Sequence, residues 1–544
     1  MKNIFIECLV ISSVMIVLLS IRIFNKTWKN IISYLFFSAI FSIIISTLFF
    51  RFLGVPISYY LLIPYLLFFV IGLFVYSREK TESKPKKGED IFKLESESGT
   101  IDFYYPRDNF MVLGGAGSGK TASVGKPILE QFIKYGWAGF IYDYKDYDYT
   151  KTAWNLVQKY KYPYKFYYVS FTDMNRTYRF NILNKCVIQN ETMLFQAMDD
   201  FFNAMKPEKG NVDEWFTAAL GLLRGVALRF YKFRGEYERL CTLPHILNFI
   251  LLATPEQLTS FLEGDLMAKM AAAAFIGASK SERTQSSIIF SINNYISNLA
   301  TNKKACYVLT GNDFIFDLVE PNDPKLFAVS NNFALESIIS PVIAMMVPIA
   351  ARRIEFGNKI KFAFVLDEMT TFKVNNFQGM PSVLREYNTA FLILTQSGTK
   401  FDKLYGKEDR ASILSNCANL FLGRTKDVEA LKYYPLFFGK EEKEKESTSA
   451  GSSSGRYNSS VTRSKQKEEV YDSNAFAELR QGEFILSLGE ANVKRLKTRF
   501  KMFHLDENPL PIVKLTTERE VDKNYDQIGI DCEMLLNANC GKGK

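Results

Sequence analysis

Three long apolar stretches occupy the first 80 residues of the chain and contain almost no charged positions. They span residues 4–21, 31–50 and 55–76. Each is close to the roughly 20 residues that a helix needs to cross a bilayer. The pattern therefore predicts three transmembrane helices within residues 1–80. Glu7 interrupts the first stretch, and if that stretch only lies on the membrane, the other two form a hairpin.

Basic residues between these stretches predict their orientation. Cytoplasmic loops carry an excess of lysine and arginine. Arg22, Lys26 and Lys29 lie between the first and second stretches, only Arg51 lies between the second and third, and several basic residues follow the third. This distribution predicts an N-terminus outside the cell and a cytoplasmic body after residue 77. A cleaved signal peptide is the alternative for the first stretch, but no small-residue cleavage site follows it.

From residue 81 onward, short apolar runs alternate with helical patterns, which is typical of a parallel α/β sheet. Residues 188–320 lose the strand pattern and show helical spacing instead, which predicts an all-α domain inserted into the α/β domain. The α/β domain then consists of residues 81–187 and 321–513. Residues 441–469 are rich in serine, glycine and charge and predict a disordered insertion, and residues 514–544 predict a polar tail.

A glycine-rich stretch follows the strand predicted at residues 109–113. It reads "GGAGSGKT" and fits the pattern G-x-x-x-x-G-K-[ST]. In this pattern, backbone N–H groups converge on phosphate oxygens, the lysine reaches the β- and γ-phosphates, and the last hydroxyl binds magnesium. We therefore predict a site for ATP and Mg²⁺. Its residues are Gly114, Gly115, Ala116, Gly117, Ser118, Gly119, Lys120 and Thr121, with Thr121 on the metal.

Two later strands end in residues suited to the same chemistry. Residues 362–366 form an apolar run that is followed directly by Asp367 and Glu368. Asp367 is predicted to bind the magnesium, and Glu368 is predicted to polarise the attacking water. The next strand, at residues 390–395, ends at Gln396, whose amide suits a contact with the γ-phosphate or with water. A polar cap on the strand is the alternative for Gln396.

A further strand, predicted at residues 138–142, ends in "DYKDYDY". Asp143 and Lys145 follow it at the carboxyl edge of the sheet, where ligands bind in such folds, although a solvated charged loop fits equally well. The tyrosines of this loop, among them Tyr147 and Tyr149, could stack on unpaired bases. The aspartates of the same loop repel a nucleic-acid backbone, which argues against this interpretation.

Composition excludes several classes of site. The seven cysteines lack paired spacing, which favours reduced thiols over disulfides or a zinc site. The chain has only two histidines, so histidine-based metal or triad chemistry is not expected. The net charge of +9 is small for this length and only weakly favours a polyanionic partner.

Taken together, these segments resemble the type IV coupling proteins, the TraG-like membrane ATPases of conjugation and type IV secretion. The resemblance runs to about residue 510 and rests on the glycine loop, "YDYK", "LTGNDFIFDL", "LDE" and "LTQSGTKFDKLYGKEDRASILSNCANLFLG". The serine-rich segment followed by "AELRQGEFILSLG" also has its counterpart there. The family usually has two membrane spans that enclose a larger external segment, whereas three closely spaced stretches occur here.

The resemblance implies a RecA-like P-loop ATPase that assembles as a ring, expected to be a homo-hexamer, at the bacterial inner membrane. Its partners would be single-stranded DNA with a bound relaxase and the proteins of the secretion channel. It also implies that Arg385, eleven residues before Gln396, reaches the site of a neighbouring subunit. A surface arginine on a helix is the alternative. Two other functions stay open: a double-stranded DNA pump of the chromosome-segregation class, and a receptor that docks protein substrates without motor activity.

Overall fold

The computed structural model describes residues 90–206, 213–354, 358–396, 398–453 and 456–540. The chain divides into two units, residues 1–89 and 90–544, and only the second is described. The three predicted membrane stretches, at residues 4–21, 31–50 and 55–76, lie outside the described residues. Within the described part, no helix is both long enough and apolar enough to span a bilayer.

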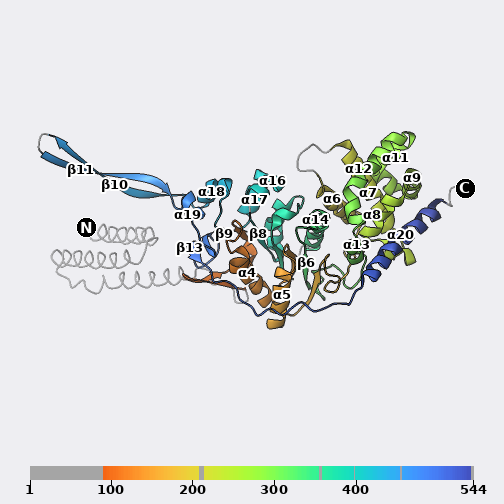
Figure 1. Ribbon diagram of the computed structural model, residues 1–544, viewed down its shortest axis with the longest axis horizontal. Coiled ribbons are helices and arrows are strands. Elements are labelled where there is room, and N and C mark those ends of the chain that lie inside the picture. The colour runs from red at the N-terminus through yellow and green to blue at the C-terminus, as the bar shows by residue number, and fades with distance from the viewer. Residues whose placement is uncertain (1–89, 207–212, 355–357, 397, 454–455, 541–544) are drawn as a thin grey trace, which may run out of the picture. The chain divides into compact units, whose positions relative to one another are not determined.

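A nine-stranded, mostly parallel sheet forms the centre of the second unit (Figure 1). Its strand order is β13-β12-β9-β3-β8-β7-β4-β6-β5, and β12 and β13 are the antiparallel members at one edge. The predicted parallel α/β fold is therefore present. The strands are β3 (Phe110–Leu113), β4 (Ala138–Asp143), β5 (Lys165–Val169), β6 (Lys325–Ser330), β7 (Phe362–Leu366), β8 (Thr389–Thr395), β9 (Asn419–Gly423), β12 (Glu483–Ser487) and β13 (Arg495–Arg499).

The central strands are buried along their whole length because both faces of the sheet are covered. In β3, Phe110 and Val112 pack into a core that includes helices α4 (Lys126–Lys134) and α5 (Asp148–Lys159). Met111 and Leu113 point to the opposite face, into a core that includes α14 (Glu336–Arg352) and the inserted helices. Alternate residues of one strand thus join two hydrophobic cores.

The strand order decides which residues meet. β8 lies between β3, which precedes the glycine loop, and β7, which precedes Asp367 and Glu368. Because these strands are parallel, their carboxyl ends lie at the same edge of the sheet. The tip of β8, which carries Gln396, is therefore placed between the glycine loop and the acidic pair.

Helices fill the segment between β5 and β6, where the all-α insertion was predicted. Asn, Asp, Ser or Thr side chains cap most of them at the N-terminus, as with Asp213, which accepts a hydrogen bond from the Phe216 backbone N–H. The helices are α6 (Glu191–Asn203), α7 (Glu214–Tyr231), α8 (Leu243–Leu252), α9 (Pro255–Glu263), α10 (Leu266–Ala271), α11 (Ala273–Gly277), α12 (Glu282–Ala300) and α13 (Lys303–Leu309).

The C-terminal segment differs from the polar tail that the sequence predicted. Residues Glu518–Cys540 form helix α20, which packs against α8, α9 and α13 of the inserted domain. Ile528 and Cys532 are fully buried there, and Leu535 is nearly so. These apolar positions recur at helical spacing, a signal that the high polar content of the tail obscured.

Residues 441–469, predicted to be disordered, form an antiparallel hairpin of β10 (Lys440–Ser453) and β11 (Arg456–Glu469). Its register places Glu442 opposite Lys467, and directly opposed unlike charges stabilise an antiparallel pair. Composition alone does not reveal such pairing. The remaining elements are β1 (Phe92–Ser96), β2 (Gly99–Phe103), α15 (Met380–Leu384), α16 (Gly398–Tyr405), α17 (Lys407–Ser415), α18 (Val428–Tyr433) and α19 (Ser473–Ala477).

Candidate functional site

The glycine loop connects β3 to a single π-helical turn, Lys120–Gly125, that continues into α4. Gly117 and Gly119 have positive φ angles of 69° and 93°, which other residues rarely adopt. A Cβ atom on Gly119 would also lie only 2.8 Å from the backbone nitrogen of Gly482. The loop therefore requires glycine at this position for both conformation and space.

Lys120 lies inside this loop. Its Nζ donates hydrogen bonds to the carbonyl oxygens of Gly114 at 2.6 Å and Gly115 at 3.1 Å. Burial lowers the pKa of Lys120 to about 8, and the nearby Glu368 opposes that shift. The ammonium group is thus held inside the loop, where phosphate oxygens would offer it stronger partners than two carbonyl groups.

Asp143, at the end of β4, and Lys145, in the loop that follows, have different roles. Asp143 is fully buried and accepts hydrogen bonds from the backbone N–H and hydroxyl of Thr150, at 2.9 and 2.8 Å. Lys145 instead reaches the glycine loop, where its Nζ donates to the Thr121 hydroxyl at 3.3 Å. Asp143 therefore shapes the turn, whereas Lys145 belongs to the site.

Asp367, at the tip of β7, is the group that fits a cation. It is only 4% exposed, and its Oδ2 atom has no hydrogen-bond partner among the described residues. Burial raises the pKa of Asp367 to about 7, and Lys145 opposes that shift. A buried carboxylate without a partner is costly unless a positive charge approaches it, so Asp367 and the Thr121 hydroxyl suit Mg²⁺.

Glu368 is held by its neighbours in a defined position. It adopts a left-handed backbone conformation with φ 52°, which is uncommon outside glycine. Its Oε1 accepts hydrogen bonds from the hydroxyls of Thr370 and Thr395, at 2.6 and 3.3 Å, and from the Gln396 backbone N–H at 3.3 Å. The two threonines orient the carboxylate, and sequence reasoning did not identify them.

Gln396 and Arg385 lie at opposite ends of β8. Gln396 is exposed at the carboxyl end, beside Glu368. Arg385 precedes the strand at its amino end, where it forms an ion pair with Asp108 at 3.2 Å, and its side chain is 55% exposed. Because β8 is parallel to β3, Arg385 lies at the sheet edge opposite to the glycine loop of its own chain.

The structure also adds Arg424, which the sequence analysis missed. It follows β9, the neighbour of β3, and its carbonyl oxygen accepts a hydrogen bond from the Gly115 N–H at 2.7 Å. A Cβ atom on Gly117 would lie 3.9 Å from Nη2 of Arg424. A basic residue directly after an apolar strand was the available signal.

One tyrosine of the loop after β4 cannot belong to the base-stacking surface that we considered. Tyr149 is fully buried, and a Cβ atom on Gly125 would lie 2.0 Å from its hydroxyl oxygen. The Tyr147 hydroxyl donates to the Arg176 carbonyl at 2.8 Å, and Tyr147 is half-buried. The interpretation was wrong for Tyr149, because the loop turns this side chain under the helix that follows the glycine loop.

Comparisons with known proteins agree with this fold. The chain is similar to the bacterial conjugative coupling protein TrwBdeltaN70, with a TM-score of 0.60 and 17% identity over 77% of this chain and 92% of that one. It is also similar to the plasmid coupling protein TrwB in complex with ADP and Mg²⁺, with a TM-score of 0.58 and 17% identity over 75% and 89% of the two chains. At such identities, the likeness shows a common fold.

A comparison with curated proteins gives no significant match. The family model described as "Type IV secretory system Conjugative DNA transfer" matches residues 78–471, most of the chain. This match includes the glycine loop, the acidic pair and the inserted helices. The chain therefore belongs to the type IV secretory system conjugative DNA transfer family.

Proposed function

We propose that this protein is an ATP-hydrolysing coupling protein that passes relaxase-bound single-stranded DNA to a type IV secretion channel during conjugation. The observation that carries the proposal is the meeting of Lys120, Asp367 and Glu368 at one edge of the sheet. Lys120 is buried in the glycine loop, and Asp367 and Glu368 both lie close enough to affect its pKa.

The residues at this edge suit a nucleotide with Mg²⁺. Lys120 would exchange its two carbonyl partners for the β- and γ-phosphates. Thr121 and Asp367 would hold Mg²⁺, which supplies positive charge that offsets the charge of the phosphates. A relative of the same fold has been described with ADP and Mg²⁺.

Glu368 is the residue proposed to activate water. Thr370, Thr395 and the Gln396 N–H fix its Oε1 atom, which leaves the remaining carboxylate oxygen to accept a proton from the attacking water. Gln396, which lies between the glycine loop and the acidic pair, would contact the γ-phosphate or orient the attacking water. These residues support hydrolysis rather than passive docking.

The location and assembly belong to the proposal as well. The apolar stretches in residues 1–80 support a multi-pass protein of the inner membrane, with the ATPase body in the cytoplasm. The position of Arg385 at the edge opposite to its own glycine loop supports a homo-hexameric ring, in which one subunit completes the site of the next.

The proposal is tested on the full chain, purified in detergent. Lys120→Ala should abolish ATP turnover and leave the fold intact, because the variant loses the charge that neutralises the phosphates. Unchanged turnover would remove the assignment of the glycine loop.

A second experiment compares how strongly single-stranded DNA, double-stranded DNA and protein substrate stimulate the ATP turnover of the wild-type chain. Stronger stimulation by double-stranded DNA would favour a segregation-type pump, and absence of turnover would favour a docking receptor.

A further inference from the structure

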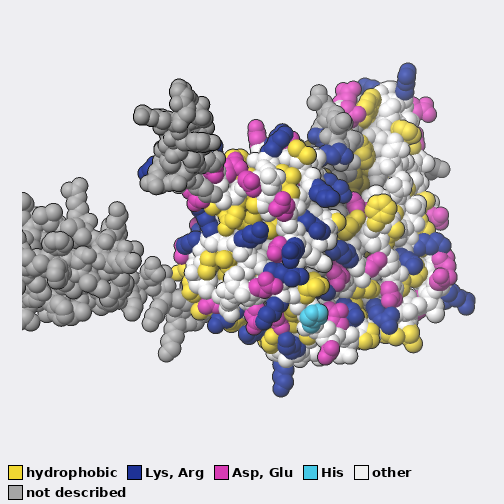
Figure 2. Space-filling view, turned by 60° about the vertical axis from the view of Figure 1, so that its left-hand side comes forward, with side chains coloured by type: hydrophobic (Ala, Val, Ile, Leu, Met, Phe, Trp, Pro, Cys, Tyr) yellow, Lys and Arg dark blue, Asp and Glu magenta, His cyan; other side chains and the backbone are white. Residues whose placement is uncertain are grey.

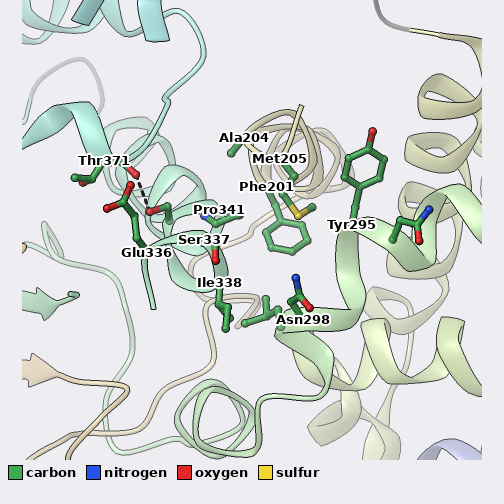
Figure 3. Close-up of a pocket in the computed structure, with 13 residues that line it drawn as sticks. Phe201, Ala204, Met205, Tyr295, Asn298, Glu336, Ser337, Ile338, Pro341 and Thr371 are labelled. Carbon is green, nitrogen blue, oxygen red and sulfur yellow. Dashed lines mark hydrogen bonds between the residues drawn. The ribbon is translucent and has the colours of Figure 1, made fainter. Parts of the chain in front are cut away.

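A pocket separate from the nucleotide site lies where the inserted helices meet the start of α14 (Figure 3). Its volume is about 280 Å³, which is smaller than the pockets that hold drug-sized ligands. One wall comes from α6 and α12, and the other comes from α14 and the segment after Glu368. The residues used below are Phe201, Asn294, Asn298, Glu336, Ser337 and Thr371.

Hydrogen bonds connect the second wall of the pocket to β4 and to the residues that follow β4 and β7. The Thr371 hydroxyl donates to the Glu368 carbonyl at 2.9 Å and shares a hydrogen bond with the Tyr142 hydroxyl at 2.7 Å. The Glu336 carboxylate accepts a hydrogen bond from Tyr144, the residue beside Lys145. A ligand that moves this wall would therefore act on Glu368 and on the loop that reaches Thr121.

The chemistry of the lining favours a neutral, planar, hydrogen-bonding group. None of the residues that line the pocket is a lysine or arginine, which disfavours a phosphate. Glu336 is the first residue of α14, where the partial positive charge of the helix terminus offsets part of its negative charge. Asn294 and Asn298 offer both donors and acceptors, and Phe201 adds an apolar surface.

An exposed aromatic residue extends the first wall. Phe290 is 69% exposed and lies four residues before Asn294 on α12, so Phe290, Asn294 and Asn298 lie along one stripe of the helix. An exposed ring next to a polar pocket is the combination that proteins use to bind single-stranded nucleic acid, in which one base inserts and its neighbour stacks.

We propose that this pocket receives one unstacked base of single-stranded DNA and that its occupation changes the position of Glu368. The inference rests on the proposed function, because it assumes that single-stranded DNA reaches this protein. It assigns to the pocket the role of coupling DNA binding to ATP hydrolysis.

The test uses the full chain and a single-stranded oligonucleotide that contains 2-aminopurine, whose fluorescence reports unstacking. Asn298→Leu and Ser337→Leu change opposite walls of the pocket, and Ser337 is exposed, so its replacement leaves the core intact. Ser260→Leu, at an exposed position of α9 outside the pocket, is the matched control. Turnover without and with the oligonucleotide is measured for each variant.

Both pocket variants should lose the 2-aminopurine signal and lower the stimulated turnover about tenfold, while basal turnover and the control stay unchanged. Stimulation and signal equal to wild type in both variants would overturn the pocket assignment alone. Turnover is also measured with a basic peptide. If the pocket variants lose stimulation of turnover by the peptide but keep the response to the oligonucleotide, the pocket binds a protein ligand instead. A wild-type chain that neither binds the oligonucleotide nor hydrolyses ATP would contradict the proposed function and this inference together.

Discussion

Asp367 shows how a single residue of this site responds to its surroundings. Burial raises its pKa to about 7, so between about pH 4 and pH 7 the folded chain holds a proton that the unfolded chain has released. The contribution of Asp367 to stability therefore falls as the pH rises through this window and stays low above it. Binding of Mg²⁺ requires the ionised form, so it should release a proton in the same range.

We predict that Asp367→Asn raises the melting temperature of the nucleotide-free chain at pH 8 and leaves it nearly unchanged at pH 4. The amide has no charge to bury, whereas the wild-type carboxylate is ionised only at the higher pH. Thermal unfolding at both pH values measures the difference, with Asp526→Asn, an exposed position on α20, as the control. Parallel pH profiles for wild type and Asp367→Asn would contradict this role of burial.

Glu368→Gln separates catalysis from binding at the neighbouring residue. Glutamine keeps the size of the side chain and an oxygen that can accept the Thr370 and Thr395 hydrogen bonds. Nucleotide affinity should stay within a few fold of wild type, while turnover should fall about 100-fold or more, because the proton acceptor is lost. Fluorescent-nucleotide titration and steady-state turnover measure the two effects. Loss of nucleotide binding would instead identify Glu368 as a structural or metal-binding residue.

At the scale of elements, helix α20 ties the end of the chain to the inserted domain. The segment before it leaves β13 and contacts the nucleotide domain on its way, since the Phe503 N–H donates to the Ala122 carbonyl and the Arg176 guanidinium donates to the Leu510 carbonyl. Figure 1 shows this segment passing below α4 and α5 to reach α20. Asp531, nearly buried, then pairs with both terminal nitrogens of Arg239, at 2.8 and 3.0 Å.

We predict that Asp531→Ala loosens α20, because the variant loses two charge-assisted hydrogen bonds, worth about 1–3 kcal/mol. Asp522→Ala is the matched control on the same helix, since its pair with Lys303 is half exposed and contributes little. Hydrogen exchange of the α20 amides should accelerate in Asp531→Ala and stay near wild type in Asp522→Ala. Equal protection in both variants would show that apolar packing alone holds the helix.

At the scale of the whole molecule, charged side chains of both signs cover the visible face (Figure 2), without one continuous basic surface. The small net charge of +9 agrees with this mixture. We therefore expect any contact between DNA and this face to depend on local groups rather than on a general basic surface. Substitution of Arg385 tests whether subunits share a site in the proposed ring.

We predict that Arg385→Ala lowers turnover and that mixing it with Lys120→Ala partly restores it. In a mixed ring, the intact Arg385 of one subunit meets the intact Lys120 of its neighbour, provided that the arginine acts across the interface. ATP turnover is measured across mixing ratios, with mixed oligomers verified. Asp108→Asn removes the same ion pair and keeps the arginine, so an equal loss of turnover in that variant would show that only the pair within the chain matters.

The sequence alone determined the local elements of the nucleotide site. The run at Phe362–Leu366 was predicted with the bounds that the structure shows, and the glycine loop was predicted between its strand and its helix. Apolar runs, glycines and a lysine at fixed spacing specify local conformation, which depends on neighbours in the chain. The helical character of the inserted segment follows from the same kind of signal.

Only the tertiary structure decided what each side chain meets. It placed β8 between β3 and β7, and it brought the Thr395 hydroxyl within hydrogen-bond distance of the Glu368 carboxylate. It also buried Tyr149 beneath the turn that follows the glycine loop. It also packed α20 against helices α8, α9 and α13 of the inserted domain. These outcomes depend on strand order and on contacts between residues far apart in the chain, which the local pattern of apolar and polar positions does not encode.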